Sequence, residues 1–378
     1  MMALAYGLPG LLLVAIILWD AFETVLVPRR IGRRVRITRY FYIVAWRVCR
    51  GLAAGIRKPS RRESALGFFG PASLLLLLVC WAAGLVFAFA LLQVAARSLA
   101  GLAPERWVTQ LYMSGETFFT LGYGDVTPAT GLGRLLAVVE SGMGFGFLGT
   151  VVGYLPTVYS SFSQRETEIS LMDACAGSPP TAAEFLARNR DFGNLAPGER
   201  ILVAWERWSA QLLETHISYP LLAYYRSQHS NQSWLAALTV MLDSTAVLVA
   251  AAEVEARPAH QAERTFAMAR HALVDITQIF ARRYPAIAAD RLPEVELARL
   301  RARLTERRVG IVTDAAFAAR LESLRLLYEP YAQALAAFLM FDLPPWVRTD
   351  ERRDNWQGGP WDRQIAAQAA EENAEDHF

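Results

Sequence analysis

Cysteine, histidine and charged residues are scarce over much of this sequence. Only three cysteines occur among the 378 residues, Cys49, Cys80 and Cys175, and they lie far apart. This spacing excludes a disulfide framework and the paired-cysteine motifs of zinc sites. Hydrophobic residues make up 53% of the chain and are concentrated before about residue 160. Their uneven distribution indicates a membrane-embedded part followed by a soluble part.

Three long stretches contain almost no charged residue. Met1 to Trp19 and Ser64 to Ala96 carry none, and only Glu140 interrupts the third stretch. About 20 apolar residues suffice to cross the hydrocarbon core of a bilayer. The pattern therefore predicts an all-α membrane protein with three transmembrane helices, over 3–27, 72–95 and 134–161.

Acidic residues are absent from Arg29 to Arg62, a stretch that holds eleven arginines and one lysine. A basic segment of this kind can bind nucleic acid or an anionic membrane surface. Because apolar spans flank it, we interpret it as a cytoplasmic segment next to the membrane. We therefore expect membrane lipids, and anionic lipid at 29–62, as partners, and no nucleic acid.

Residues 40–56 within this segment are amphipathic. At a period of 3.6 residues they sort into two opposite faces. The basic face holds Arg39, Arg47, Arg50 and Arg57, and the apolar face holds Phe41, Val44, Val48 and Leu52. A membrane crossing would place Arg47 and Arg50 near mid-bilayer, at roughly 2.5–3.5 kcal/mol each. We favour a helix lying in the membrane interface over a further crossing.

Asp20 and Glu23 lie near the inner end of the first span, on one helix face. Either they sit at the level of the lipid headgroups, or they contact the basic segment and orient it. The first interpretation is preferred, because the ends of spans tolerate charge.

After Ser163 charges become dense and apolar residues recur at helical spacing. The pattern predicts a soluble helical domain over 163–348, and no strand series. Its expected helices are 181–190, 198–228, 232–256, 259–283, 294–308 and 313–340. Trp234 to Ala252 is long enough to span a membrane, but Asp243 in its middle favours a buried core helix. The polar tail, 349–378, is predicted to be disordered.

A short irregular segment follows the second span. Trp107 to Phe119 is apolar but too short to cross a membrane, and the Gly-rich, Thr-rich residues 120–130 cannot continue a helix. Irregular backbone at membrane depth must be buried in protein or line a pore. Gly122 and Gly124 can adopt positive φ, which lets successive carbonyls point toward one axis. Such a stack of carbonyls can replace the water around a dehydrated K⁺.

The motif Thr120-Leu121-Gly122-Tyr123-Gly124-Asp125 resembles the selectivity filter of prokaryotic potassium channels, usually Thr-Val-Gly-Tyr-Gly-Asp. The resemblance covers roughly residues 70–160, a pore module of two spans and a re-entrant loop. It implies ion binding by Thr120, Leu121, Gly122, Tyr123 and Gly124, with K⁺ held at the first four. Leu121 departs from the usual valine and, lacking β-branching, is expected to make the filter less stiff.

The resemblance extends to residues on both sides of the filter. Glu116 stands where many of these channels carry a glutamate that pairs with the aspartate after the filter, here Asp125. Gly144 matches the hinge of the pore-lining helix, and Pro156 is a candidate bend at the gate. Gly144 is one of five glycines in this span, so close packing against a neighbouring helix is an equally good interpretation.

These observations predict five parts. They are an anchor helix at 1–30, an interfacial helix at 31–65, a pore module at 66–162, a cytoplasmic helical domain at 163–348 and the tail. The resemblance implies a homotetramer that conducts K⁺ passively, with no cofactor besides the permeant ion and no enzymatic activity. His216, His229 and Asp243 fit no known metal-site spacing.

The expected location is a bacterial inner membrane, with the N-terminus outside and the helical domain in the cytoplasm. That domain is a candidate sensor for an unidentified gating signal. Two alternatives remain open. One is a weakly selective cation channel, and the other is a membrane-anchored sensor or enzyme with a vestigial pore.

Overall fold

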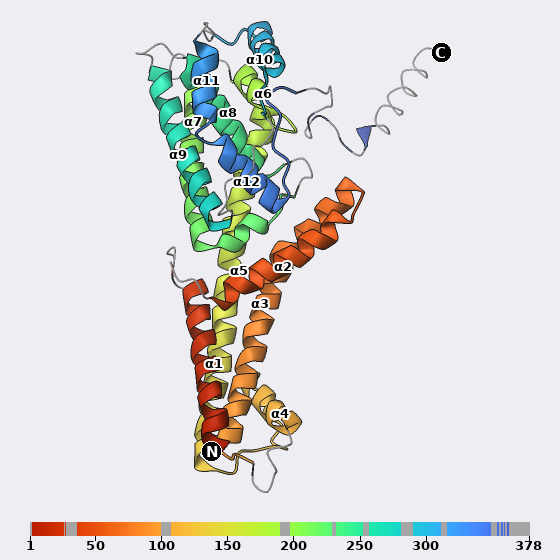
Figure 1. Ribbon diagram of the computed structural model, residues 1–378, viewed down its shortest axis with the longest axis vertical. Coiled ribbons are helices and arrows are strands. Elements are labelled where there is room, and N and C mark those ends of the chain that lie inside the picture. The colour runs from red at the N-terminus through yellow and green to blue at the C-terminus, as the bar shows by residue number, and fades with distance from the viewer. Residues whose placement is uncertain are drawn as a thin grey trace, which may run out of the picture. The chain divides into compact units, whose positions relative to one another are not determined.

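The computed structural model describes residues 2–25, 27, 36–99, 107–189, 197–228, 232–251, 257–280, 290–310, 316–348, 354, 357, 359 and 361–362 (Figure 1). The chain divides into two compact units. The membrane unit comprises Met1–Phe162 and Ile217–Tyr225, and the helical unit comprises Ser163–His216 and Arg226–Phe378. The described residues form helices and no strand. The protein is therefore an all-α membrane protein, as the sequence predicts.

The described residues of the membrane unit form five α-helices. They are α1 (Met2–Val25), α2 (Ile37–Ala54), α3 (Pro59–Ala95), α4 (Trp107–Phe118) and the first part of α5 (Gly131–Ala176). Helices α1, α3 and α5 are long and apolar enough to cross a membrane, which agrees with the three predicted spans. Helix α2 does not meet that criterion, which fits its amphipathic sequence. The first seven residues of the basic segment, 29–35, lie outside the described residues.

Helices α1 and α3 run side by side and approach closely through glycines (Figure 1). A Cβ atom on Gly10 would lie 2.9 Å from the carbonyl oxygen of Ala88. One on Gly84 would lie 2.6 Å from Cδ1 of Ile17, which is 3% exposed. Helices in a bilayer associate through this kind of backbone approach, because lipid offers no hydrophobic driving force between them.

Asp20 of α1 caps the N-terminus of α2. Its carboxylate accepts hydrogen bonds from the Thr38 backbone N–H at 3.1 Å, from the Thr38 hydroxyl at 2.5 Å and from Trp81 Nε1 at 3.1 Å. Asp20 is 4% exposed, and Arg36 at the N-cap position of α2 supplies no side-chain cap of its own. A carboxylate at a helix N-terminus satisfies free N–H groups and interacts favourably with the helix dipole.

Glu23 contributes to the same contact, since its carboxylate lies 3.5 Å from Nε of Arg36. These contacts support the second interpretation of Asp20 and Glu23, in which they contact the basic segment and orient it, although the first was preferred from the sequence. The two carboxylates hold the start of the basic helix against α1. The sequence left this choice open because it does not show which segment lies beside α1.

A short insert from the second half of the chain completes the membrane unit. It is Ile217–Tyr225, and it contains the 3₁₀ helix η1 (Pro220–Tyr224). The rings of Tyr154 and Tyr219 are 5.7 Å apart, and those of Phe162 and Tyr225 are 5.4 Å apart. Tyr224 stacks on Tyr42 of α2 at 5.7 Å. The insert thus contacts α5 and the basic helix α2.

In the part of the helical unit that the structure describes, the end of α5 is followed by seven further helices. They are α6 (Ala182–Arg188), α7 (Pro197–Ser218, of which all but its last two residues belong to this unit), α8 (Trp234–Ala251), α9 (Arg257–Phe280), α10 (Glu294–Glu306), α11 (Phe317–Arg325) and α12 (Glu329–Leu339). Helix α8 is apolar enough to cross a membrane, yet every residue except Val249 is buried. Helices α6, α9, α11 and α12 surround it, so α8 is a core helix as predicted.

Two predicted helices are shorter than expected. The helix predicted over 198–228 ends at Ser218, because Pro220 disfavours helical geometry in the preceding residue. The helix predicted over 313–340 is two helices, because a turn at 326–328 interrupts it and Pro330 lies in the first turn of α12. Helix α6 is capped by Thr181, whose hydroxyl accepts from the Glu184 N–H at 3.3 Å.

Candidate functional site

Helix α4 directly precedes the Gly-rich motif in the chain. It ends at Phe118, and two further backbone bonds close its last turn, from the Thr120 N–H to the Thr117 carbonyl at 3.1 Å and from the Leu121 N–H to the Glu116 carbonyl at 2.8 Å. Helical geometry stops there. The C-terminal end of a helix carries partial negative charge, which favours a nearby cation.

The backbone of the motif alternates between two conformations. Thr120, Gly122 and Gly124 have φ values of +57°, +62° and +79°, whereas Leu121 and Tyr123 between them do not have positive φ. Positive φ at every second residue is the conformation that the sequence predicts for the two glycines of this segment. The row of carbonyls facing one axis stays a prediction.

Thr120 is a part of this geometry that sequence reasoning missed. A β-branched residue in the left-handed region is uncommon and costs about 1–2 kcal/mol. Backbone strain of this kind concentrates at functional sites, where the surroundings hold it in place. The one signal in the sequence is position, because Thr120 stands two residues before Gly122, which stands two before Gly124.

The motif is exposed to solvent in the single chain. All residues from Phe119 to Asp125 are exposed, including Tyr123 at 71% and Leu121 at 57%. Irregular backbone with free polar groups is not tolerated against lipid. At membrane depth this segment therefore needs further protein or a water-filled pore around it.

Asp125, the last residue of the motif, is held by a contact from α4. The Tyr112 hydroxyl contacts both carboxylate oxygens, at 3.2 Å and 3.1 Å. Glu116, the partner that the resemblance implies, is buried on the same helix at 5% exposed. Tyr112 is a supporting residue that the sequence analysis did not single out. Its position four residues before Glu116 places both side chains on one face of α4.

A buried polar cluster lies behind the motif. The Ser114 hydroxyl of α4 contacts the Val86 carbonyl of α3 at 2.7 Å and the Glu140 carboxylate of α5. Ser114 and Glu140 are both fully buried. Gln93 donates to the Gly133 carbonyl at 3.4 Å and accepts from the Ser98 hydroxyl. These contacts tie together the three helices that position the motif.

Gly144 is a site of close backbone approach. A Cβ atom there would lie 1.8 Å from the carbonyl oxygen of Phe118, the last residue of α4. At Gly142 and Gly146 the same atom would meet no described atom within 4 Å. Close packing therefore explains Gly144 in this structure. Helix α5 continues through both Gly144 and Pro156, so their roles as hinge and bend stay predictions.

Two comparisons with known proteins bear on this site. The model of a family described as "Ion channel" matches residues 74–161, which contain the end of α3, α4, the motif and the first part of α5. A protein of Bacillus subtilis (strain 168) named "Uncharacterized membrane protein YdjJ" is 26% identical over 209 residues. That alignment covers 54% of this chain and 59% of the relative, so the chain spans less than two thirds of the relative's length. No solved structure matches.

The fold, the motif and the family match together support an ion channel of the membrane for this part of the chain. The matched residues begin and end inside the membrane unit, at 74 and 161. The helical unit lies outside that match, so its role is inferred from its own structure.

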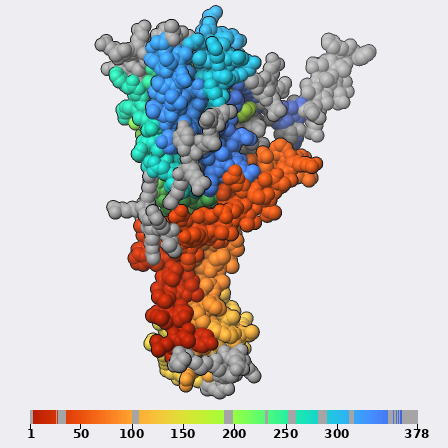
Figure 2. Space-filling model, in the orientation of Figure 1, coloured from red at the N-terminus to blue at the C-terminus, as the bar shows by residue number. Residues whose placement is uncertain are grey.

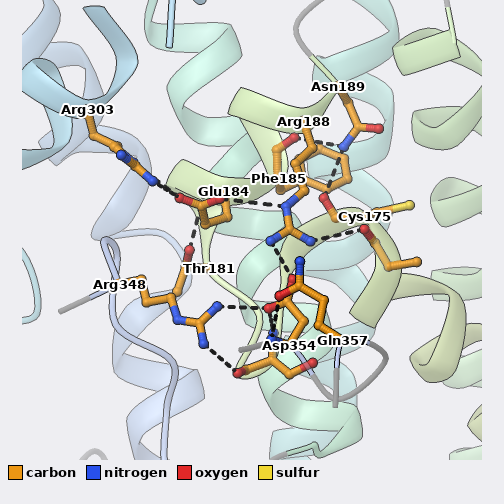
Figure 3. A network of polar contacts seen from close by, with 12 residues as sticks. Cys175, Thr181, Glu184, Phe185, Arg188, Asn189, Arg303, Arg348, Asp354 and Gln357 are labelled. Atoms are coloured by element: carbon orange, nitrogen blue, oxygen red, sulfur yellow. Dashed lines mark hydrogen bonds and ion pairs between the residues drawn. The ribbon is translucent and has the colours of Figure 1, made fainter. Parts of the chain in front are cut away.

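A polar network in the helical unit surrounds Asp354 (Figure 3). Its carboxylate accepts from Arg188 at 2.7 Å, from Arg348 at 2.8 Å and from the Ser178 N–H at 3.0 Å. Burial raises the pKa of Asp354, but these hydrogen bonds outweigh burial and hold the pKa below its ordinary value. Asp354 is 3% exposed, although it falls in the range predicted to be disordered. The network therefore fastens a residue of the tail to the end of α5 and to α6.

A second polar network pairs the Asp243 carboxylate of α8 with Arg291. Arg291 binds both Asp243 oxygens, at 3.1 Å and 2.7 Å, and the Tyr328 hydroxyl donates to the same carboxylate at 2.5 Å. The described residues contain no group of three or more acidic, histidine or cysteine side chains that could hold a metal. Asp243 is thus the partner of an arginine. His229 lies outside the described residues.

Proposed function

We propose that the chain is one subunit of a potassium-selective channel that conducts K⁺ passively. The observation that carries this proposal is the alternating φ of Thr120, Gly122 and Gly124 directly after α4. Carbonyls that face one axis take the place of the hydration shell of K⁺. The ion positions are formed by Thr120, Leu121, Gly122 and Tyr123, with Gly124 completing the motif.

The proposed assembly is a homotetramer. Each chain contributes one motif, and a closed ring of carbonyls needs several copies around the axis. The exposure of the motif in one subunit supports this assembly, because bare backbone at membrane depth must be covered. Large apolar side chains are also exposed on the first part of α5, namely Leu132, Leu135, Val138, Phe145, Leu148 and Val152. Neighbouring subunits would cover part of this surface.

The proposed topology places the N-terminus outside and the helical unit in the cytoplasm of a bacterial inner membrane. The arginines between α1 and α3 support this orientation, since positive charge accumulates on the cytoplasmic side. The helical unit would control opening through the insert Ile217–Tyr225. This insert contacts α5 through Tyr219 and Tyr225 and continues directly into helices of the helical unit.

The decisive experiment is ion flux through the purified protein in liposomes. The wild type should pass K⁺ and reject Na⁺ when reversal potentials are measured in mixed solutions. Gly122→Ala should abolish flux, because its Cβ is strained at φ +62°. Gly131→Ala is the control, since its added Cβ meets no described atom and lies outside the motif.

Each alternative has its own outcome in this assay. Comparable passage of Na⁺ and K⁺ would identify a weakly selective cation channel. No flux by the wild type under any condition would favour a membrane-anchored sensor or enzyme with a vestigial pore, and the proposal would fail. The gating role is tested separately with Tyr219→Ala, which should alter open probability while leaving ion selectivity unchanged.

A further inference from the structure

An apolar groove runs between α2 and α3 in the membrane unit. Its cavity volume is about 910 Å³. Helix α2 lines it with every third or fourth residue, including Tyr40, Val44 and Val48, and α3 lines it with Phe69, Leu76 and Cys80. The lining of α2 extends from Ile37 to Ala53, which corresponds to roughly 24 Å of helix. The groove therefore follows almost the whole length of α2.

The walls of the groove are strongly exposed for apolar side chains. Val44 and Val48 are each 57% exposed, Leu52 is 72% exposed, and Leu76 on the opposite wall is 51% exposed. The surface of α2 is also open to view in Figure 2. Contiguous apolar surfaces of this kind mark sites where another apolar molecule binds.

The two ends of the groove differ in charge. At one end lie Ile56 and Ala65, beside the turn that joins α2 to α3. Arg57 and Lys58 belong to this turn, and Arg61 lies one helical turn before Ala65 on the same face of α3. All three cations are exposed.

The other end begins at Ile37, where the charges are balanced. Arg36 lies 3.5 Å from the Glu23 carboxylate and donates to Thr24 at 3.1 Å, and Asp20 caps α2. No acidic residue occurs in the sequence between Glu23 and Glu63. The turn is thus the end that attracts an anion.

We propose that this groove binds an anionic phospholipid, with its phosphate at Arg57, Lys58 and Arg61 and an acyl chain along the apolar walls. The combination of an apolar channel and a cationic end matches a molecule with an apolar tail and an anionic head. The site narrows the lipid partner expected at 29–62 to a defined set of residues. The proposal rests on the membrane character of α3 and is independent of potassium selectivity.

The test is native mass spectrometry of the full-length protein in detergent, with added phosphatidylglycerol or phosphatidylcholine of identical acyl chains. Phosphatidylglycerol should be retained in preference to phosphatidylcholine. Ala45→Trp places a large side chain on the groove wall and should remove retention of both lipids. Ala54→Trp is the matched control, because Ala54 is exposed on α2 but does not line the groove.

A second pair of variants tests the headgroup without disturbing the fold. Arg61→Gln should weaken retention of phosphatidylglycerol about fivefold, the effect of one basic residue at an anionic lipid surface. Arg50→Gln removes the same charge from the opposite face of α2 and should have little effect. Equal retention of the two lipids by the wild type would overturn the proposal, as would unchanged retention in Ala45→Trp. A change in subunit number in place of lipid loss would show that a second copy occupies the groove, and the proposal would fail.

Discussion

Replacing Gly144 with alanine tests how helix α5 supports the motif. The new Cβ would lie 1.8 Å from the Phe118 carbonyl oxygen, whereas atoms in optimal contact are about 3.5–4 Å apart. The end of α4 and helix α5 would have to separate by more than about 1 Å. Overpacking of this kind typically costs about 1–3 kcal/mol. We expect the upper part of that range, because the obstacle is backbone and cannot rotate away.

The displacement would act directly on the carbonyl row, since Thr120 follows Phe118 by only two residues. Two measurements check it: K⁺ flux into liposomes and the resistance of the oligomer to heating in detergent. Gly144→Ala should lower both. Gly142→Ala and Gly146→Ala add the same methyl group where no described atom lies within 4 Å, and they should retain both properties. Wild-type flux together with wild-type heat resistance in Gly144→Ala would refute this reasoning.

Three further predictions concern stability. Asp243→Asn should lower the free energy of unfolding of the helical unit by about 1.5–3 kcal/mol, because it removes the charge of a buried carboxylate that binds Arg291 and leaves Glu329 as the remaining anionic partner of this arginine; chemical denaturation followed by tryptophan fluorescence measures this, and a loss below 1 kcal/mol would contradict it. Burial lowers the pKa of His216 from 6.5 to about 3, so the unfolded chain binds a proton between these values while the folded chain does not. Stability should therefore fall by about 2 kcal/mol on acidification from pH 7 to pH 5, and His216→Gln should remove this part of the pH dependence. Gly10→Leu should separate α1 from α3, because even a Cβ there would lie 2.9 Å from the Ala88 carbonyl; weaker protection of α1 from proteolysis would report it, and unchanged protection would count against close packing.

The features that the sequence predicts well are those with a periodic or local signal. Uncharged stretches predict α1, α3 and α5, and the 3.6-residue period predicts the amphipathic helix α2. Gly122 and Gly124 predict positive φ, because only glycine readily adopts it, and both glycines have it in the structure. The membrane unit and the helical unit meet between Phe162 and Ser163, where the charges become dense.

The features that the sequence could not supply depend on contacts between distant segments. Tyr112 and Asp125 are separated by 13 residues, and Arg188 and Asp354 by 166, so no local pattern joins them. The left-handed conformation of Thr120 was missed because a β-branched residue gives no sign of positive φ. The sequence analysis places the insert Ile217–Tyr225 in a helix over 198–228, and only its aromatic contacts reveal that it belongs to the membrane unit.

The Asp20 contacts also bear on the order in which the chain is assembled during synthesis. Its carboxylate belongs to the first helix made, but its partners come 18 residues later at Thr38 and 61 residues later at Trp81. A nascent chain that stops before Trp81 can satisfy this carboxylate only with Thr38, and it lacks the bond from α3. Because an incompletely paired charge is costly in hydrocarbon, we expect this end of α1 to insert fully only once α3 lies beside it. A single carboxylate would thereby link the insertion of α1 to that of α3.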